Sequence, residues 1–118
     1  MSTLIACLST GKGTWGHVSR LIKESPWDKV ILITNEFGKE NFTKSSNTEL
    51  ILIDPNQGIE ELSKEIKEKL KSQIKDSEVA LNIISGSGKE HSALLSALLK
   101  LGVGIRLIAL TKDGMKEV

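Results

Sequence analysis

Asn82-Ile-Ile-Ser-Gly-Ser-Gly-Lys89 is the stretch from which the organisation of this chain can be worked out. It follows the apolar run Val79–Leu81 and opens a Leu- and Ala-rich pattern at helical spacing, Glu90–Leu101. Glycines at such a strand-to-helix turn let a ligand approach the backbone closely. The first amides of a helix lack partners inside the helix and carry the positive end of its dipole, so they attract anions. The stretch therefore indicates a phosphate or nucleotide site, to which Lys89 adds a full positive charge.

A glycine-rich turn that binds nothing is the alternative. The stretch matches neither the P-loop pattern, G-x-x-x-x-G-K followed by Ser or Thr, nor the dinucleotide pattern G-x-G-x-x-G. Taken alone, it leaves the binding and the non-binding interpretation open.

Short apolar runs alternate with helical patterns along the whole chain. The runs are residues 4–8, 29–34, 50–53, 79–84 and 105–110, while 35–47 is polar and predicts a loop with one short helix at most. Runs that are apolar throughout are typical of parallel strands covered by helices on both faces. The Asp113-Gly114 turn predicts a hairpin into a last short strand, 115–118. We therefore expect a single domain over residues 1–118: a three-layer, Rossmann-like α/β fold with strand order 3-2-1-4-5 and a C-terminal β-hairpin strand.

This strand order brings a second glycine-rich turn, Ser9–Gly13, close to the first. The two turns follow the first and fourth strands, which are neighbours in the sheet, and ligands bind where the carboxyl ends of such strands meet. Hydroxyls, backbone amides and two lysines suit a phosphodiester better than a neutral metabolite. The predicted ligand-binding residues are Ser9, Thr10, Gly11, Lys12 and Gly13 on one wall and Ser85, Gly86, Ser87, Gly88 and Lys89 on the other.

Composition limits the classes of function. The 118 residues carry 16 Lys and Arg against 15 Asp and Glu, a formal charge of +1, so we expect no bulk attraction to duplex nucleic acid. No run reaches the roughly 18 apolar residues of a membrane span, and no signal peptide is expected. One cysteine and two separated histidines predict no metal site. Cys7 lies in an apolar run and predicts a buried free thiol, which fits a reducing, cytoplasmic location.

Three further polar residues have both a structural and a functional interpretation. Asp54 ends the third strand and is followed by Pro55, so it is a turn residue or a ribose ligand. His17 falls one turn into the first helix, where it is a surface histidine or a general base that faces the pocket. His91 follows Lys89 on the leucine side of its helix, which favours a packed or interface histidine.

These motifs together resemble the CARF domain, the CRISPR-associated Rossmann fold. The resemblance rests on the apolar first strand with Ser9-Thr10-x-Gly, on the Asn82–Lys89 stretch before a Leu/Ala helix, and on the closing hairpin at Asp113-Gly114. Members of this family have a polar turn after the first strand and Ser/Thr-Gly-Gly-Ser/Thr-Lys after the fourth. Ser87 stands where the family more often has its second glycine. CARF domains usually carry a fused effector or DNA-binding domain, whereas this sequence ends at Val118, so a stand-alone ring nuclease or small sensor subunit is expected.

The resemblance implies a ligand, an assembly and a reaction. CARF domains form two-fold dimers that bind cyclic oligoadenylate, a second messenger of type III CRISPR defence, and the ring nucleases among them cut the ring without metal or cofactor. Attack by a ribose 2′-OH on the adjacent phosphate leaves a 2′,3′-cyclic phosphate. In this sequence Lys89 would stabilise the charge on the phosphate, Ser9 or Thr10 would position the ribose–phosphate, and His17 would be the general base if the helix points it inward.

A homodimer is also indicated by the helical pattern 90–101, which is apolar over most of its circumference and must be covered on more than one side. A neighbouring helix of the same chain is the alternative cover. Two other functions stay open: a Rossmann-like scaffold subunit without a ligand, and an enzyme that acts on a mononucleotide or dinucleotide. The absence of G-x-G-x-x-G after the first strand, and of an acid at the Thr34-Asn35 end of the second, weighs against the enzyme.

Overall fold

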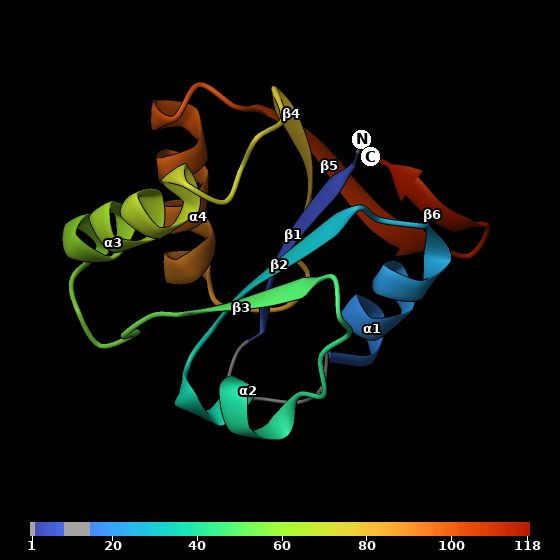
Figure 1. Ribbon diagram of the computed structural model, residues 1–118, viewed down its shortest axis with the longest axis horizontal. Coiled ribbons are helices and arrows are strands. Elements are labelled where there is room, and N and C mark those ends of the chain that lie inside the picture. The colour runs from blue at the N-terminus through green and yellow to red at the C-terminus, as the bar shows by residue number, and fades with distance from the viewer. Residues whose placement is uncertain (1, 9–14) are drawn as a thin grey trace.

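A six-stranded sheet forms the middle layer of the computed structural model, which describes residues 2–8 and 15–118 (Figure 1). Its order is β3-β2-β1-β4-β5-β6, and all neighbours are parallel except the antiparallel pair β5–β6. The strands are β1 (Thr3–Leu8), β2 (Lys29–Thr34), β3 (Thr48–Leu52), β4 (Glu78–Asn82), β5 (Gly104–Thr111) and β6 (Gly114–Glu117). The predicted fold class, strand order and closing hairpin strand are confirmed.

Helices cover both faces of the sheet, as the apolar runs predict. They are α1 (Trp15–Glu24), α2 (Glu36–Asn41), α3 (Ile59–Lys71) and α4 (Gly88–Lys100). Figure 1 shows α3 and α4 together on one side of the sheet and α1 on the other. On β1, Ile5 and Cys7 pack toward α3 and α4, whereas Leu4, Ala6 and Leu8 pack toward α1. Because every residue of β1 is buried, this strand reads as one continuous apolar run.

The fourth strand ends earlier than the sequence predicts, at Asn82 instead of Ile84. The last residue pair between β4 and β5 is Leu81 with Leu107. Beyond it, the Asn82 side chain takes over, because its Nδ2 donates to the carbonyl of Ile108 at 2.9 Å. Ile84 then leaves the sheet and is half exposed. The run of apolar residues around Asn82 does not reveal that this side chain replaces the backbone in the hydrogen bonding of the sheet.

The polar segment between β2 and β3 holds one short helix, α2. Its N-cap is Asn35, whose Oδ1 accepts a hydrogen bond from the amide of Gly38 at 3.0 Å. Gly38 packs so closely against Thr34 that an added Cβ would overlap the Thr34 hydroxyl. The capped turn therefore fixes α2 directly at the carboxyl end of β2. In the part of the chain that the structure describes, no helix is both long and apolar enough to cross a membrane.

Candidate functional site

The carboxyl ends of β1 and β4 lie side by side, as the strand order requires. Leu4, Ile5 and Ala6 of β1 are in parallel register with Ala80, Leu81 and Asn82 of β4. The two strands therefore end at the same edge of the sheet. The first predicted wall, Ser9, Thr10, Gly11, Lys12 and Gly13, lies outside the described residues. The second wall, Ser85 to Lys89, is described in full.

A capping box closes the start of α4. The Oγ of Ser87 accepts from the amide of Glu90 at 3.2 Å, and a carboxylate oxygen of Glu90 accepts from the amide of Ser87 at 2.7 Å. Glu90 is only 6% exposed, so its negative charge is held at the helix terminus where an anion was expected. Sequence reasoning missed this role, although the spacing Ser87-x-x-Glu90 before an apolar run is itself a capping-box signature.

The glycines of the turn have different roles. Gly86 has φ +112°, and an added Cβ would lie 2.9 Å from the Cβ of Cys7 and 2.9 Å from Nε2 of His91. At Gly88, the first residue of α4, an added Cβ would meet nothing within 4 Å. Gly86 is therefore required by the backbone conformation and by close packing. Gly88 instead leaves open space beside the first amide of the helix.

His91 and Ser85 complete the turn. Nε2 of His91 lies 2.8 Å from the carbonyl oxygen of Ser85 and donates its proton to it. This contact gives His91 a structural role in holding the turn against α4. The side chain of Ser85 is fully buried, and its Oγ is the buried side-chain oxygen that finds no hydrogen-bond partner among the described residues. A buried hydroxyl without a partner costs free energy, roughly 1–3 kcal/mol.

Lys89 reaches away from its own turn. Its Nζ donates to the carbonyl oxygen of Pro55, in the loop after β3, at 3.0 Å. This contact ties the start of α4 to a loop 34 residues earlier in the chain. The predicted phosphate-binding cation is therefore present at the carboxyl edge of the sheet, next to the β3–α3 loop.

His17 contacts the other side of the β4 end. Its Nε2 lies 3.2 Å from Nδ2 of Asn82. The orientation of the Asn82 amide is fixed, because Nδ2 also donates to the carbonyl of Ile108 and Oδ1 accepts from the amide of Ile84. Nε2 of His17 must therefore accept, which places the proton of the neutral ring on Nδ1. Partial burial, with a smaller contribution from the nearby Arg20 charge, lowers the pKa of His17 below its ordinary value of 6.5.

This geometry does not suit His17 as a general base through Nε2. The lone pair of that nitrogen already accepts the Asn82 amide proton. What His17 offers instead is a neutral ring with an N–H donor on its other nitrogen. Asn82, which is fully buried, is the residue that fixes this tautomer, and sequence reasoning did not assign it a role.

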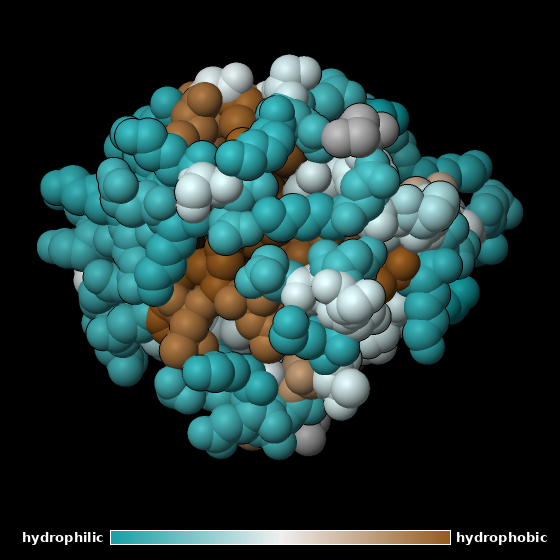
Figure 2. Space-filling view, in the orientation of Figure 1, coloured by the Kyte–Doolittle hydropathy of each residue, from teal (hydrophilic) through white to brown (hydrophobic). Residues whose placement is uncertain are grey.

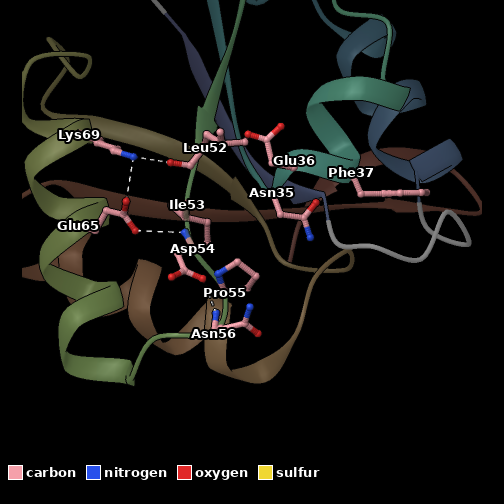
Figure 3. Close-up of a pocket in the computed structure, with 10 residues that line it drawn as sticks. All are labelled: Asn35, Glu36, Phe37, Leu52, Ile53, Asp54, Pro55, Asn56, Glu65 and Lys69. Carbon is pink, nitrogen blue, oxygen red and sulfur yellow. Dashed lines mark hydrogen bonds and ion pairs between the residues drawn. The ribbon is translucent and has the colours of Figure 1, made fainter.

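A cavity of about 570 Å³ lies beside the Lys89 contact, between α2 and the β3–α3 loop. Figure 3 shows its two sides, with Asn35 and Glu36 facing the segment Leu52–Pro55. Its lining residues are Asn35, Glu36, Phe37, Leu52, Ile53, Asp54, Pro55, Asn56, Glu65 and Lys69. The sequence did not predict this cavity, although it flagged the Asp54-Pro55 turn at its wall.

Asp54 has a structural role, and it also lines the cavity. Its Oδ1 accepts from the amide of Asn56 at 3.0 Å and so closes the turn after β3. Glu65 on α3 supports the same turn by accepting from the amide of Asp54 and from Lys69 Nζ. Burial acts to raise the pKa of Glu65, but hydrogen bonds from Lys69, the Asp54 amide and Gln57 outweigh it and lower that pKa.

Besides the sheet, α3 of the same chain also covers α4. Ala93, Leu94, Ala97 and Leu98 are buried, and α3 packs against α4. The neighbouring helix thus accounts for part of the apolar circumference. Leu99, near the end of α4, stays 70% exposed, and two apolar residues outside the helix are also exposed: Ile84 at 50% and Leu107, on β5, at 37%. Figure 2 shows apolar surface over the C-terminal end of α4.

Among the described residues, no group of three or more His, Cys, Asp or Glu could hold a metal ion. Cys7 is a free thiol on β1, and burial, together with the Glu90 charge, raises its pKa far above the ordinary range. A thiol in this environment is not a nucleophile, because the thiolate is the reactive form.

Comparisons with known proteins assign no family. No protein-family model matches the sequence, and no curated protein matches it. The fold is similar to a solved structure from Pyrococcus furiosus, the C-terminal domain of the PF1911 hydrogenase, with 17% identity and a TM-score of 0.48 over 90% of this chain and 88% of that chain. At this identity and TM-score the likeness transfers no activity to the chain.

Proposed function

We propose that this domain binds a cyclic oligoadenylate, as a CARF-like receptor of type III CRISPR defence, and that it does so as a symmetric homodimer. The observation that carries the proposal is the position of Lys89. It lies at the edge where the neighbouring strands β1 and β4 end, and it contacts the next loop, at Pro55, beside a cavity. Ligands of open α/β sheets bind at such a switch point.

The start of α4 supplies further phosphate contacts. The amides of Gly88 and Lys89 have no hydrogen-bond partner in the described part of the chain, because the capping box engages only those of Ser87 and Glu90. The space beside Gly88 is open, so a phosphate oxygen can reach these amides. Lys89 and two helix amides form a site of the right chemistry for one phosphodiester.

The homodimer is proposed from the exposed apolar groups near α4. Leu99, on α4, is 70% exposed, and Ile84 and Leu107 are also exposed; a second copy packed against this helix would bury Leu99. A two-fold axis would also place two phosphate sites on one ring. Light scattering at micromolar concentration should give twice the monomer mass of 12.9 kDa, and Leu99→Glu should shift it to the monomer. A monomer mass for the unaltered protein would overturn the assembly.

The binding test is titration calorimetry with cyclic tri-, tetra- and hexa-adenylate against ATP and NAD. Removing a lysine–phosphate contact costs roughly 1.5–3 kcal/mol, so Lys89→Ala should weaken binding about tenfold or more. Lys64→Ala, on the exposed face of α3, is the matched control and should bind as the unaltered protein does. Absence of binding to every ring, or equal affinity of the Lys89 and Lys64 variants, would overturn the proposal.

The same titration mixtures test ring cleavage. With EDTA present and protein in excess, chromatography shows whether the ring opens to a 2′,3′-cyclic phosphate. Nothing in the geometry of the described residues favours His17 as the base of this reaction, since its Nε2 is engaged by Asn82. Cleavage that His17→Ala leaves unchanged would place the reaction on other groups, with Lys89 and the predicted residues Ser9 and Thr10 as the next variants.

A further inference from the structure

The cavity at the ends of β2 and β3 has the size and the lining of a small-molecule site. Its volume of about 570 Å³ falls within the range of roughly 300–1,000 Å³ that is typical of ligand pockets. It is built on fixed elements: the α2 N-cap at Asn35 on one side and the Asp54 turn on the other. Figure 2 shows apolar surface gathered over β3, between α3 and α2.

The apolar part of the lining suits a flat, uncharged ring system. Phe37, Leu52, Ile53 and Pro55 all line the cavity. The ring of Phe37 packs against Trp15, with centroids 5.8 Å apart, so it is held in place rather than free to fill the space. A heterocycle that enters the cavity would bury apolar surface against these side chains.

The charged part of the lining excludes a phosphate from the same space. Among the described residues, three carboxylates line it, from Glu36, Asp54 and Glu65, against the single ammonium group of Lys69. Lys69 already pairs with Glu65 at 2.9 Å and also donates to the carbonyl of Leu52. Within the part of the lining that the structure describes, the carboxylates of Glu36 and Asp54 are thus not balanced by a cation. Carboxylates accept hydrogen bonds from hydroxyl and amino groups and repel anions.

We propose that this cavity binds a ribonucleoside, with the base against the apolar lining and the ribose hydroxyls on the carboxylate of Asp54. That this nucleoside belongs to a larger ligand rests on the proposed function. The two sites adjoin, because the carbonyl of Pro55, at the cavity wall, accepts a hydrogen bond from Lys89. A phosphodiester at Lys89 would then continue directly into a nucleoside in the cavity. Lys89 favours an anion, and the carboxylates that line the cavity favour an uncharged group. A nucleotide matches this pair of neighbouring sites, because its phosphate is anionic and its nucleoside is neutral.

The experiment uses free nucleosides, so that it does not depend on the phosphate site. Adenosine and 2′,3′-dideoxyadenosine are titrated into the ¹⁵N-labelled protein, and amide shifts are followed. Adenosine should move the amides of Asp54 and Asn56 saturably, and the dideoxy compound should bind about tenfold more weakly, because a hydrogen bond to a charged group is lost. Asp54→Asn keeps the oxygen that closes the turn but removes the charge, and it should abolish most of that difference.

Glu40→Gln is the matched control, because Glu40 is an exposed acid on the same short helix α2 and does not line the cavity. It should keep the preference for adenosine. No saturable shifts, shifts that map elsewhere, or equal binding of the two nucleosides would each overturn the nucleoside pocket. Adenosine binding in the cavity together with no binding of any cyclic oligoadenylate would leave the pocket in place and overturn the proposed function instead.

Discussion

Replacing Gly86 by alanine should destabilise this domain strongly, because two independent costs fall on one position. At φ +112° a residue with a Cβ is strained, at a cost of about 1–3 kcal/mol. The new Cβ would also lie 2.9 Å from the Cβ of Cys7, which belongs to the fully buried strand β1 and cannot move aside. Overpacking of this kind costs about 1–3 kcal/mol. We expect Gly86→Ala to lower the free energy of unfolding by roughly 2–6 kcal/mol.

Gly88→Ala, two residues further on, is the matched control. Its Cβ would meet nothing within 4 Å, and alanine is the better helix former, so the change should be neutral or stabilising by up to about 1 kcal/mol. Urea unfolding gives the free energy of unfolding of both variants and thermal unfolding gives their Tm, each followed by circular dichroism. For a domain of this size 1 kcal/mol corresponds to roughly 3–6 °C, so Gly86→Ala should lower Tm by at least about 6 °C. A Gly86 variant as stable as the unaltered protein, or a Gly88 variant equally destabilised, would refute the reasoning.

Three further predictions concern the groups around the same turn. Glu90→Gln should keep the hydrogen bond to the Ser87 amide but remove a negative charge beside the proposed phosphate, so cyclic oligoadenylate binding in calorimetry should tighten about three- to tenfold; weaker binding would place the phosphate elsewhere. Cys7 should resist iodoacetamide in the folded protein and react only in denaturant, because its thiol is buried with a raised pKa, and mass spectrometry of the native protein should show no adduct. His17 has a folded-state pKa below 6.5, so the unfolded chain binds its proton first, and the stability that neutral His17 contributes should be lost as pH falls through 6.5 and below. Urea titrations of the unaltered protein and of His17→Gln should converge as pH falls, and a parallel pH dependence of the two would contradict the assigned tautomer and its environment.

The sequence was sufficient to predict the fold, because the residues that define it act locally or through simple periodicity. Strands buried on both faces appear as unbroken apolar runs, and the Asp113-Gly114 turn marks the hairpin, where Gly114 indeed has φ +104°. The strand boundaries were less accessible. Asn82 ends β4 through a side-chain bond to Ile108, a partner 26 residues away that no local pattern identifies.

The candidate site was only partly predictable, for the same reason. Strand order correctly placed the turn after β4 next to the end of β1. It did not show which groups of that turn are already occupied. Lys89 contacts Pro55, His17 contacts Asn82, and both contacts join segments far apart in the chain. The cavity likewise forms between α2 and the β3–α3 loop, two segments that the sequence describes only as polar turns.

The charges at the start of α4 determine which anion the proposed phosphate site would favour. Lys89 contributes one positive charge, the helix terminus about half of one, and Glu90 subtracts one, so the local balance is only weakly positive. A phosphodiester, with one negative charge, lies closer to this balance than a terminal phosphate, which carries nearly two. Position 90 needs a hydrogen-bond acceptor, because its side-chain oxygen caps the amide of Ser87. At the proposed site, the negative charge of Glu90 would therefore favour internal phosphodiesters, such as those of a closed ring, over nucleotides that end in a phosphate.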